Sequence, residues 1–366
     1  MTGKEFFIGL DVHKDSVQMA VFSETGEDTI YETKMLNNTS QIVKKVQKFC
    51  QEGEAFVAYE SGSSGYVIHR AMEKMGIKCY VLPANKVAKK RDDRIKTDKR
   101  DARLIGRELR SNSIRPISVP DEEDEAVRDL LRCREDLNND IRRVKQRLLK
   151  FFDRHGHFYH AKGSNWTIGH FKWMETIVFE HDHEKTVYLE YRSQIEELLK
   201  RNIRLCKMIE KTAESPRYRD RISKLRAFKG IDYLIALNII CEIGDFRRFA
   251  SAGSFMSYLG FVPRENSSGS KRIQGGITKA GNRALRCLLV EGAWHYTKNA
   301  ETGRRLNQRR KHSPQDAIKT ADIALERLHK KYLRLLSYGK HKNVAVTAVA
   351  RELAGFIWAV QVSGTY

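Results

Sequence analysis

The first 115 residues alternate short apolar runs with segments in which apolar side chains recur every three or four positions. Apolar runs between turn signals are typical of strands, and the longer spacing is typical of helices. The pattern predicts three strands, a helix, a strand, a helix, a strand and a last helix, an order found in mixed sheets with helices on their faces. The predicted strands cover 6–11, 17–22, 29–35, 55–60 and 78–82, and the first two helices cover 40–50 and 66–75.

Pro116 and Pro120 end this pattern, and from Asp121 the chain becomes charged and helical. Two stretches then carry apolar residues at three- and four-residue steps over several turns, which predicts two long helices in an antiparallel coiled-coil arm over 121–213. The segment 155–183 between them is rich in histidine and aromatic residues and receives no assignment. The apolar positions are Val127, Leu130, Leu137, Ile141, Val144, Leu148 and Phe151, then Tyr188, Tyr191, Ile195, Leu198, Cys206 and Ile209.

Residues 216–366 predict a mainly helical domain, interrupted by a loop rich in serine and glycine over 263–276. The most apolar late stretch, 344–362, contains Arg351 and Glu352, so we expect a buried helix and not a membrane span. The other predicted helices cover 222–228, 233–242, 252–259, 279–295 and 314–336.

Composition narrows the class of protein. The 366 residues suffice for two or three domains, and 67 Lys and Arg against 46 Asp and Glu give a net charge of +21. Such a charge favours a polyanionic partner, for which nucleic acid is the usual choice and an anionic membrane surface the rival. The N-terminus has no signal-peptide pattern, and the six cysteines contain no C-x-x-C pair. We therefore expect a cytoplasmic protein without disulfides or structural zinc.

Four carboxylates form the first candidate site. Asp11 and Glu60 each end a predicted strand, and adjacent parallel strands would bring them together. Asp98 and Asp101 are three apart, so on a helix they share a face. Each residue alone is more typical of a turn, a cap or a solvated helix face, but four crowded carboxylates repel one another unless a cation neutralises them. Mg²⁺ is the oxygen-binding choice, and two such ions would clamp the attacking and leaving oxygens of a phosphodiester.

A one-sided basic run surrounds the last two carboxylates. Charge runs are usually solvated helix faces. Next to candidate metal ligands, however, this run is typical of a tract that follows a phosphate backbone. Its members are Lys86, Lys89, Lys90, Arg91, Arg94, Lys96, Lys99, Arg100, Arg103, Arg107 and Arg110.

The loop 266–272 is the second candidate site, because it combines serines with positive charge. A serine needs activation before it attacks phosphorus, and nearby cations would hold the scissile phosphate. By its own residues the loop is more typical of an ordinary surface loop. The cations near it are Lys271, Arg272, Lys279, Arg283 and Arg286.

Two other signals lead elsewhere. His155, His157 and His160 suit a metal by residue type, but they lack a carboxylate or cysteine partner, so we expect an ordinary turn. Neither Ser270-Lys271 nor Thr278-Lys279 has the glycine spacing of a Walker A motif, so ATP is not implied.

The motifs together resemble the IS110/IS1111 transposase family over nearly the whole chain, in the family's domain order. Gly-Leu-Asp-Val-His-Lys near the start, Tyr-Glu-Ser-Gly and Lys-Thr-Asp-Lys-Arg-Asp-Ala resemble its RuvC-like N-terminal domain. Asp232 departs from the pattern, since a glycine there would complete a Gly-Ile-Gly turn; we therefore do not expect a standard helix-hairpin-helix phosphate binder. The C-terminal marks are Lys229-Gly230-Ile231, Glu242-Ile243-Gly244-Asp245, Tyr258-Leu259-Gly260, the run from Pro263 to Gly269 and the run from Ile277 to Arg283.

The resemblance implies an α/β plus α fold: an RNase H/RuvC-like mixed sheet with helices over 1–115, a coiled-coil helical arm over 121–213 and a mainly helical domain over 216–366. It implies that Mg²⁺ is held by Asp11, Glu60, Asp98 and Asp101. The family's serine nucleophile matches Ser268, with Ser267 adjacent. The family's partners imply a structured non-coding guide RNA that pairs with donor and target DNA, and a homo-oligomer (dimer or tetramer) in which domains of different protomers build one site.

We therefore expect an RNA-guided DNA transposase or recombinase of the cytoplasm and nucleoid, in which Ser268 attacks a DNA phosphodiester and the metal carboxylates position that phosphate. The alternative is a two-metal, structure-specific endonuclease resembling a Holliday-junction resolvase, in which water is the nucleophile. A third possibility is a basic nucleic-acid-binding protein with a coiled-coil arm and no catalysis. The basic residues Lys96, Arg100 and Arg103 are expected to contact nucleic acid.

Overall fold

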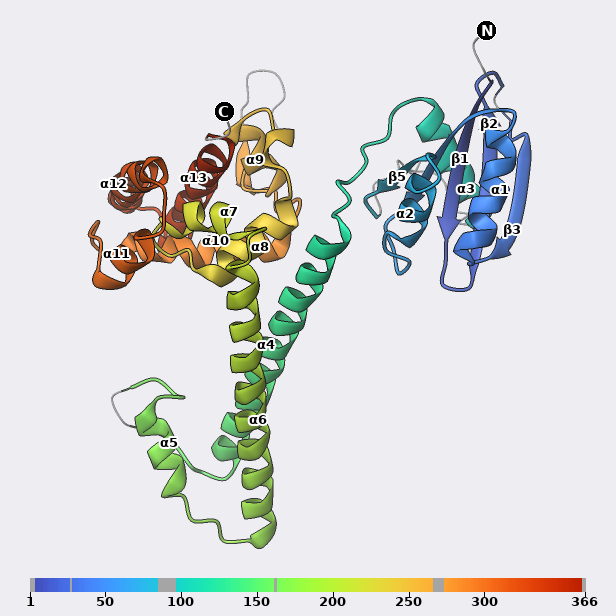
Figure 1. Ribbon diagram of the computed structural model, residues 1–366. Coiled ribbons are helices and arrows are strands. Elements are labelled where there is room, and N and C mark those ends of the chain that lie inside the picture. The colour runs from blue at the N-terminus through green and yellow to red at the C-terminus, as the bar shows by residue number, and fades with distance from the viewer. Residues whose placement is uncertain (1–3, 27, 85–96, 161–162, 266–272, 364–366) are drawn as a thin grey trace. The chain divides into compact units, whose positions relative to one another are not determined.

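A computed structural model gives the fold of the chain (Figure 1). It divides into two compact units, residues 1–119 and residues 120–366, and each is described here by itself. The second unit contains both the helical arm and the helical C-terminal region. The structure describes residues 4–26, 28–84, 97–160, 163–265 and 273–363.

The first unit is built on a five-stranded mixed sheet with the order β3-β2-β1-β4-β5. β2 is antiparallel to β1 and β3, whereas β1, β4 and β5 are parallel. The predicted order of strands and helices is confirmed, and with it the mixed α/β class of this unit. The elements are β1 (Lys4–Val12), β2 (Ser16–Ser23), β3 (Tyr31–Leu36), α1 (Thr39–Cys50), β4 (Gly53–Glu60), α2 (Val67–Glu73), β5 (Lys78–Leu82) and α3 (Asp98–Arg110).

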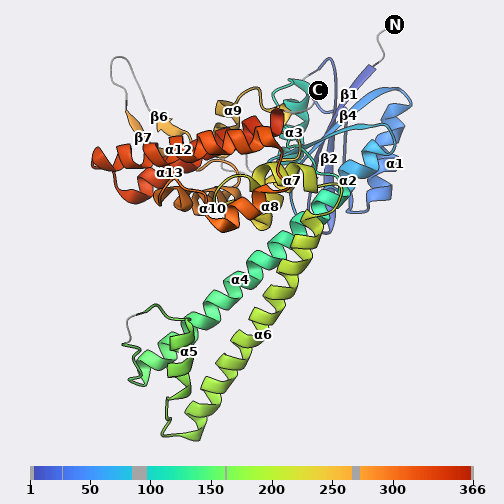
Figure 2. The same cartoon turned by 60° about the vertical axis from the view of Figure 1, so that its left-hand side comes forward.

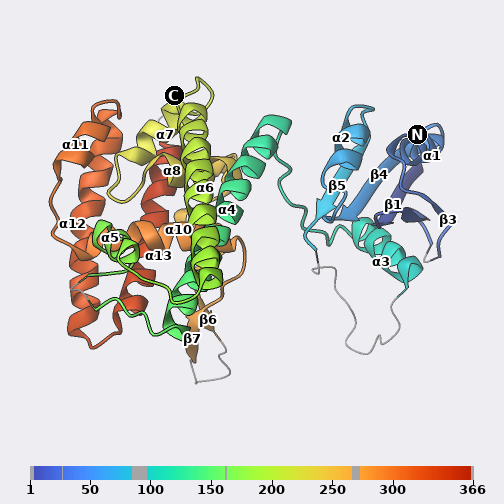
Figure 3. The ribbon, with the colours of Figure 1, turned by 90° about the horizontal axis from the view of Figure 1, so that it is seen from below.

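Helices cover both faces of this sheet: α1 and α2 lie on one face and α3 on the other (Figure 3). Ile8 and Leu10 of β1 are buried in the core with α1 and α2, so the alternate residues Phe7, Gly9 and Asp11 face α3. Gly9 lets α3 lie directly on the strand, because a Cβ there would be 2.1 Å from the Ala102 carbonyl oxygen. This contact sets the start of α3 beside the end of β1.

The arm consists of two long helices, α4 (Glu122–Arg154) and α6 (Asp182–Ala213), which lie side by side in opposite directions (Figures 1 and 2). Predicted apolar positions such as Ile141, Leu148 and Ile195 form their common core, and two long helices occupy the stretches that the sequence predicted to be helical. Asp121 caps α4 by accepting a hydrogen bond from the Asp124 amide at 2.8 Å, and four acidic residues in the first turn suit the positive end of the helix.

The unassigned segment at the end of the arm contains a short helix, α5 (Ile168–Glu175), packed against α4 and α6 through aromatic side chains. His155 Nδ1 lies 3.2 Å from a Glu184 carboxylate oxygen, and the His157 ring contacts Phe152. These contacts tie the segment to the arm. His155, His157 and His160 are not in the group of potential metal ligands found among the described residues.

The C-terminal region packs its helices around α8 and α13 in a single apolar core. By length and composition α13 qualifies as a membrane-spanning helix, but half of its apolar window is buried, and Val346, Leu353 and Ile357 lie in this core, as expected of a buried helix. The elements are α7 (Arg219–Arg226), α8 (Tyr233–Ile243), η1 (Phe246–Arg248), α9 (Ala252–Tyr258), β6 (Pro263–Glu265), β7 (Gln274–Ile277), α10 (Arg283–Ala293), η2 (Trp294–Thr297), α11 (Arg304–Arg310), α12 (Gln315–Ser337) and α13 (Lys342–Val362).

Two predictions for this region were wrong in detail. The helix predicted from residue 279 begins only at Arg283, because Lys279 and Gly281 have left-handed backbone (φ 57° and 81°) and Asn282 caps the helix. The stretch predicted as a loop over 263–276 contains the β6–β7 hairpin, whose strands are too short and too exposed to give an alternating apolar pattern.

Candidate active site

The ends of the parallel strands β1 and β4 place two of the predicted carboxylates. Leu10 pairs with Tyr59, so Asp11 and Glu60 follow at the next position of each strand. Asp11 also pairs with Gln18 on β2, and Gln18 pairs with Lys34 on β3. Paired residues point to the same face of a sheet. Four neighbouring strands therefore present a row of polar side chains at this level, on the face that α3 covers.

The start of α3 supplies the other two carboxylates. Thr97 caps the helix by accepting a hydrogen bond from the Arg100 amide, which puts Asp98 and Asp101 in the first turn. Unpaired amides and the helix dipole stabilise carboxylates at this end of a helix. The predicted shared face of Asp98 and Asp101 is thus directed to the end of β1.

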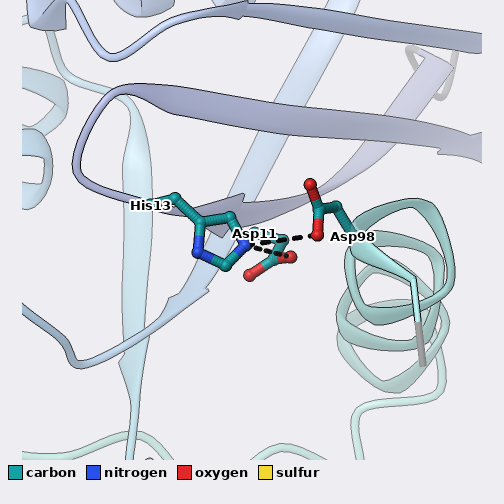
Figure 4. A group of neighbouring side chains, drawn as sticks. All are labelled: Asp11, His13 and Asp98. Carbon is teal, nitrogen blue, oxygen red and sulfur yellow. Dashed lines mark hydrogen bonds and ion pairs between the residues drawn. The ribbon is translucent and has the colours of Figure 1, made fainter.

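Asp11, His13 and Asp98 form the carboxylate cluster (Figure 4). His13 Nε2 lies 3.1 Å from Asp11 Oδ2 and 3.4 Å from Asp98 Oδ1, so the imidazole bridges the two carboxylates. One potential ligand atom from each residue lies within 4.8 Å of the others. Lys34 Nζ donates to the other Asp98 oxygen, Oδ2, at 3.2 Å.

The pKa values of the two aspartates move in opposite directions. Burial raises the pKa of Asp11, the neighbouring Asp101 and Asp98 raise it further, and His13 opposes the rise. The hydrogen bond from Lys34 lowers the pKa of the exposed Asp98. Asp11 is therefore a carboxylate whose charge is costly here unless a cation offsets it. Carboxylate oxygens with one imidazole nitrogen are a donor set that suits a divalent cation, so these residues fit a metal.

The structure brings only some of the four predicted carboxylates into the cluster. Asp11 and Asp98 come together in the cluster, and Asp101 is near enough to influence Asp11 electrostatically. Glu60 lies at the next strand end but is not a member of the cluster. The sequence analysis did not select His13, although it is two residues beyond Asp11 and so shares the strand periodicity of that carboxylate.

Lys34 carried no signal in the sequence, because only the pairing of β3 with β2 and of β2 with β1 places it near Asp98. Long-range register of this kind cannot be read from the local pattern of one strand.

Some of the cations in the predicted basic run contact other residues of the first unit. Arg103, predicted to contact nucleic acid, forms a two-point ion pair with Glu32 of β3. Arg107 and Arg110 lie over the ring of Phe22. Lys99 and Arg100 are exposed on α3. Lys96 and the predicted run from Lys86 to Arg94 fall outside the described residues.

The predicted nucleophile Ser268, its neighbour Ser267 and the cations Lys271 and Arg272 also fall outside the described residues. The described chain on either side forms the serine-loop frame, residues 258–265 and 274–286. Within it β6 and β7 pair in antiparallel fashion, the Thr278 amide donates to the Val262 carbonyl at 2.8 Å and the Lys279 amide donates to the Gly260 carbonyl at 3.1 Å. These bonds bring the two ends of the loop together.

Two glycines press the halves of this frame against each other. A Cβ at Gly260 (φ 73°) would lie 2.0 Å from the Ala280 carbonyl oxygen, and one at Gly281 would lie 2.0 Å from that of Tyr258. Arg286 Nη1 donates to the carbonyls of Leu259, Ala280 and Gly281 at 2.9 to 3.1 Å. Arg286, predicted to hold a phosphate, thus uses this nitrogen to hold the frame, whereas the predicted phosphate contacts Lys279 and Arg283 are exposed.

The frame is connected to the arm through Glu242 at the end of α8. Glu242 accepts hydrogen bonds from Asn282 Nδ2 at 2.9 Å and from Arg132 of α4 at 3.3 Å. Buried Arg128 of α4 donates to the Cys241 and Glu242 carbonyls, which satisfies carbonyls at the end of α8. The Glu242-Ile243-Gly244-Asp245 motif therefore fixes the frame to α4 and α8.

Comparisons with known proteins agree with this architecture. Residues 8–156 match the model of the DEDD transposase domain of the IS110 type, and residues 210–308 match that of the IS116/IS110/IS902 transposase family. The chain is 33% identical over 364 residues to a putative transposase of Sinorhizobium fredii, covering 98% of this chain and 88% of that protein. It is 34% identical over 345 residues to the transposase for insertion sequence element IS1533 of Leptospira borgpetersenii, covering 91% and 97%.

The first match spans nearly the whole α/β unit with the carboxylate cluster, and all of the first arm helix beyond it. The second match spans the end of the arm, α8 and the serine-loop frame. Both similar proteins cover the two units together. The fold is therefore that of a RuvC-like DEDD domain followed by a helical arm and a helical transposase domain, and the chain belongs to the IS110 family of insertion-sequence transposases, which are DNA-processing enzymes.

Proposed function

We propose that this transposase cuts and rejoins DNA through Ser268, assisted by Mg²⁺ held by Asp11, Glu60, Asp98 and Asp101. The observation that carries the proposal is the carboxylate cluster, in which strand end and helix start converge on one point. Burial of Asp11 beside other carboxylates makes a cation favourable there. When bound, Mg²⁺ would polarise the scissile phosphate.

The chain's own residues prepare this site. His13 lies between Asp11 and Asp98 and keeps the two carboxylates directed at one point. Lys34 holds the second Asp98 oxygen and keeps that carboxylate ionised. Gly9 fixes the height of α3 above β1, and with it the position of Asp98. Preorganisation of this kind lowers the cost of binding the reacting phosphate.

The proposed chemistry conserves the energy of the phosphodiester. The Ser268 oxygen forms a bond to phosphorus while one phosphorus–oxygen bond of the DNA backbone breaks, and the released sugar oxygen takes up a proton. In the second step a sugar hydroxyl of another strand displaces the serine oxygen, which regains a proton. Lys271, Arg272, Lys279 and Arg283 would stabilise the negative charge that develops on the phosphate.

The proposed partners follow from charge and from the family. A net charge of +21 supports extensive contact with nucleic acid, and we propose donor DNA, target DNA and a structured guide RNA of the element as its partners. We propose a dimer or tetramer in which the two domains of one active site come from different protomers. The corresponding location is the cytoplasm, at the nucleoid.

A covalent-adduct assay tests the mechanism. Wild-type protein is mixed with guide RNA, Mg²⁺ and labelled donor and target DNA, denatured and examined for a protein–DNA species. We expect the adduct with wild type and with the neighbouring Ser267→Ala control, and none with Ser268→Ala. An adduct that survives Ser268→Ala, or no adduct with wild type, would contradict the proposal.

The alternative is a metal-dependent, structure-specific endonuclease that uses water as its nucleophile. One observation favours it: all three residues of the carboxylate cluster, Asp11, His13 and Asp98, belong to the first unit. It predicts full DNA cleavage by Ser268→Ala and none by Asp11→Asn. Binding that is independent of Mg²⁺, with cleavage by neither protein, would instead identify a nucleic-acid-binding protein without catalysis.

A further inference from the structure

A pocket in the C-terminal region lies apart from the serine-loop frame and is lined by cations. It is formed by the end of α7, the turn into α8, the η2 helix and α11, of which α7, α8 and α11 are labelled in Figure 1. Among its lining residues the single acidic one is Asp232. The cationic pocket is defined by six basic side chains: Arg226, Lys229, His295, Arg305, Arg309 and His312.

Backbone carbonyls and one aromatic ring hold three of these cations in place. Lys229 Nζ donates to the Asn299 carbonyl at 2.7 Å and to the Glu301 carbonyl at 3.3 Å. Arg309 Nη1 donates to the Ile231 carbonyl at 2.9 Å. The guanidinium of Arg226 lies over the Tyr233 ring, with Cζ 3.3 Å from the ring centroid. Carbonyls and rings orient a cation without cancelling its charge, so the pocket is both ordered and positive.

Several groups in the cationic pocket lack compensation. The Nε atoms of Arg226 and Arg309 are buried and have no hydrogen-bond partner among the described residues. Asp232 accepts the Ile235 amide at 3.0 Å as the cap of α8, so its carboxylate serves the helix. Burial lowers the pKa of Lys229, His295 and Arg309, and neighbouring cations lower each of them further, while Glu301, Glu291 and Asp232 respectively oppose the change. An anion in the pocket would relieve both the burial cost and the repulsion.

We propose that the cationic pocket binds a backbone phosphate of DNA. The start of α8, an 11-residue helix, contributes Asp232 and Tyr233 to the lining. The face of Tyr233 is covered by Arg226, so this ring is not an open platform for an unstacked base. Phosphate contact of this kind positions a duplex without reading its sequence.

This site differs from a turn that binds phosphate through its own backbone. Asp232 stands in that turn, and Gly230 is already pressed against α10, since a Cβ there would lie 2.4 Å from the Gly292 carbonyl oxygen. The pocket instead takes its charge from side chains of α7, η2 and α11. None of the six was among the predicted nucleic-acid contacts, and the site is independent of Ser268 and of the carboxylate cluster.

The salt dependence of DNA binding tests the proposal. The Ser268→Ala protein, with its other residues intact, is titrated with a labelled DNA duplex at several salt concentrations, so that cleavage does not interfere. We expect Arg226→Gln/Arg305→Gln to lower the slope of log affinity against log salt by about 2, or about 1 for each lost contact, and to weaken binding uniformly across sequences. Arg305→Lys keeps the charge and should keep the slope.

The matched control is Arg143→Gln/Lys150→Gln on the arm, which removes the same charge from cations that pair with Asp140 and Asp153. We expect its slope to change by less than half as much. An unchanged slope in the pocket variant, or an equal change in the control, would overturn the proposal. So would a slope that changes with an RNA duplex and not with DNA. Arg305→Gln alone, at an exposed side chain, gives the same test if the double variant unfolds. Adduct formation is scored separately, so failure here leaves the serine mechanism intact.

Discussion

The carboxylate cluster and the serine-loop frame are held in place by different kinds of structure. Asp11 and Asp98 stand at the end of a central strand and at the start of a capped helix, so regular secondary structure positions them. The frame depends on two short strands, left-handed glycines and the three-carbonyl contact of Arg286. The carboxylate cluster is thus positioned by strands and helices packed in a core, whereas the serine-loop frame is positioned by close contacts between turns.

This difference matters because the proposed reaction needs both regions. Residues on strands and helices keep their geometry more tightly than residues on loops. A loop, by contrast, can adapt when DNA is bound. The carboxylate cluster is therefore expected to be the preformed part of the reaction centre.

The largest expected effect is on strand joining. Asp98→Asn and Ser268→Ala should each lower it by about a thousandfold or more, because residues that act in one step lose nearly the whole of its rate when either is removed. Asp220→Asn, at an exposed position paired with Arg219, is the control and should stay near wild type. Strand joining is measured with labelled donor and target DNA. Normal strand joining by the Ser268→Ala protein would show that the serine loop is not needed for the reaction that the carboxylate cluster supports.

Two glycine substitutions compare how the regions tolerate a single methyl group. Gly9→Ala and Gly260→Ala each place a Cβ about 2 Å from a carbonyl oxygen, and Gly260 also has a positive φ. We expect each to lower the free energy of unfolding by about 1–3 kcal/mol or more, measured by denaturant unfolding. Gly303→Ala is the control, because its Cβ would meet no atom within 4 Å. A Gly260→Ala protein as stable as wild type would show that the serine-loop frame can shift to accommodate the added methyl group.

A smaller effect is expected from Lys34→Met. Because the Lys34 hydrogen bond lowers the pKa of Asp98, its removal should raise that pKa toward the usual value. Stability that depends on ionised Asp98 is present above the ordinary carboxyl pKa and is lost as pH falls through the lowered one, so the variant, whose Asp98 pKa lies closer to the ordinary value, should have less of this stability to lose. Carboxyl NMR titration measures the change. Lys78→Met, which breaks the exposed pair with Glu54, should leave Asp98 unchanged.

The sequence predicted regular elements well and contacts between distant residues poorly. The strands at 6–11 and 17–22 gave strong apolar runs because β1 and β2 are buried on both faces, and the helix at 40–50 gave a clear periodicity because α1 buries one face in the core that contains Ile8, Leu10 and Ile42. Asp11 and Asp98 could be predicted as site residues because each was selected from the local sequence of its own strand or helix. Lys34, the Arg103–Glu32 pair and the role of Arg286 depend on register and turn geometry, which no local pattern encodes.

The smallest effect concerns the end of the arm. His170 is fully buried among Tyr159, Trp166 and Trp173, and burial lowers its pKa. The unfolded chain therefore takes up a proton first, and the second unit should lose stability as pH falls below about 6.5 and stop losing it below the lowered pKa. His170→Phe should flatten this part of the profile in thermal unfolding between about pH 7 and pH 5. An unchanged profile would show that His170 does not titrate on unfolding.

The most direct test of the central claim is to identify the residue that carries DNA. The adduct formed by wild-type protein with guide RNA, Mg²⁺ and DNA is digested and the linked peptide is sequenced by mass spectrometry. The account predicts a nucleotide on Ser268, and no adduct after chelation or with Asp98→Asn. A link at another residue, or an adduct of equal yield without metal and without the Asp98 carboxylate, would contradict it.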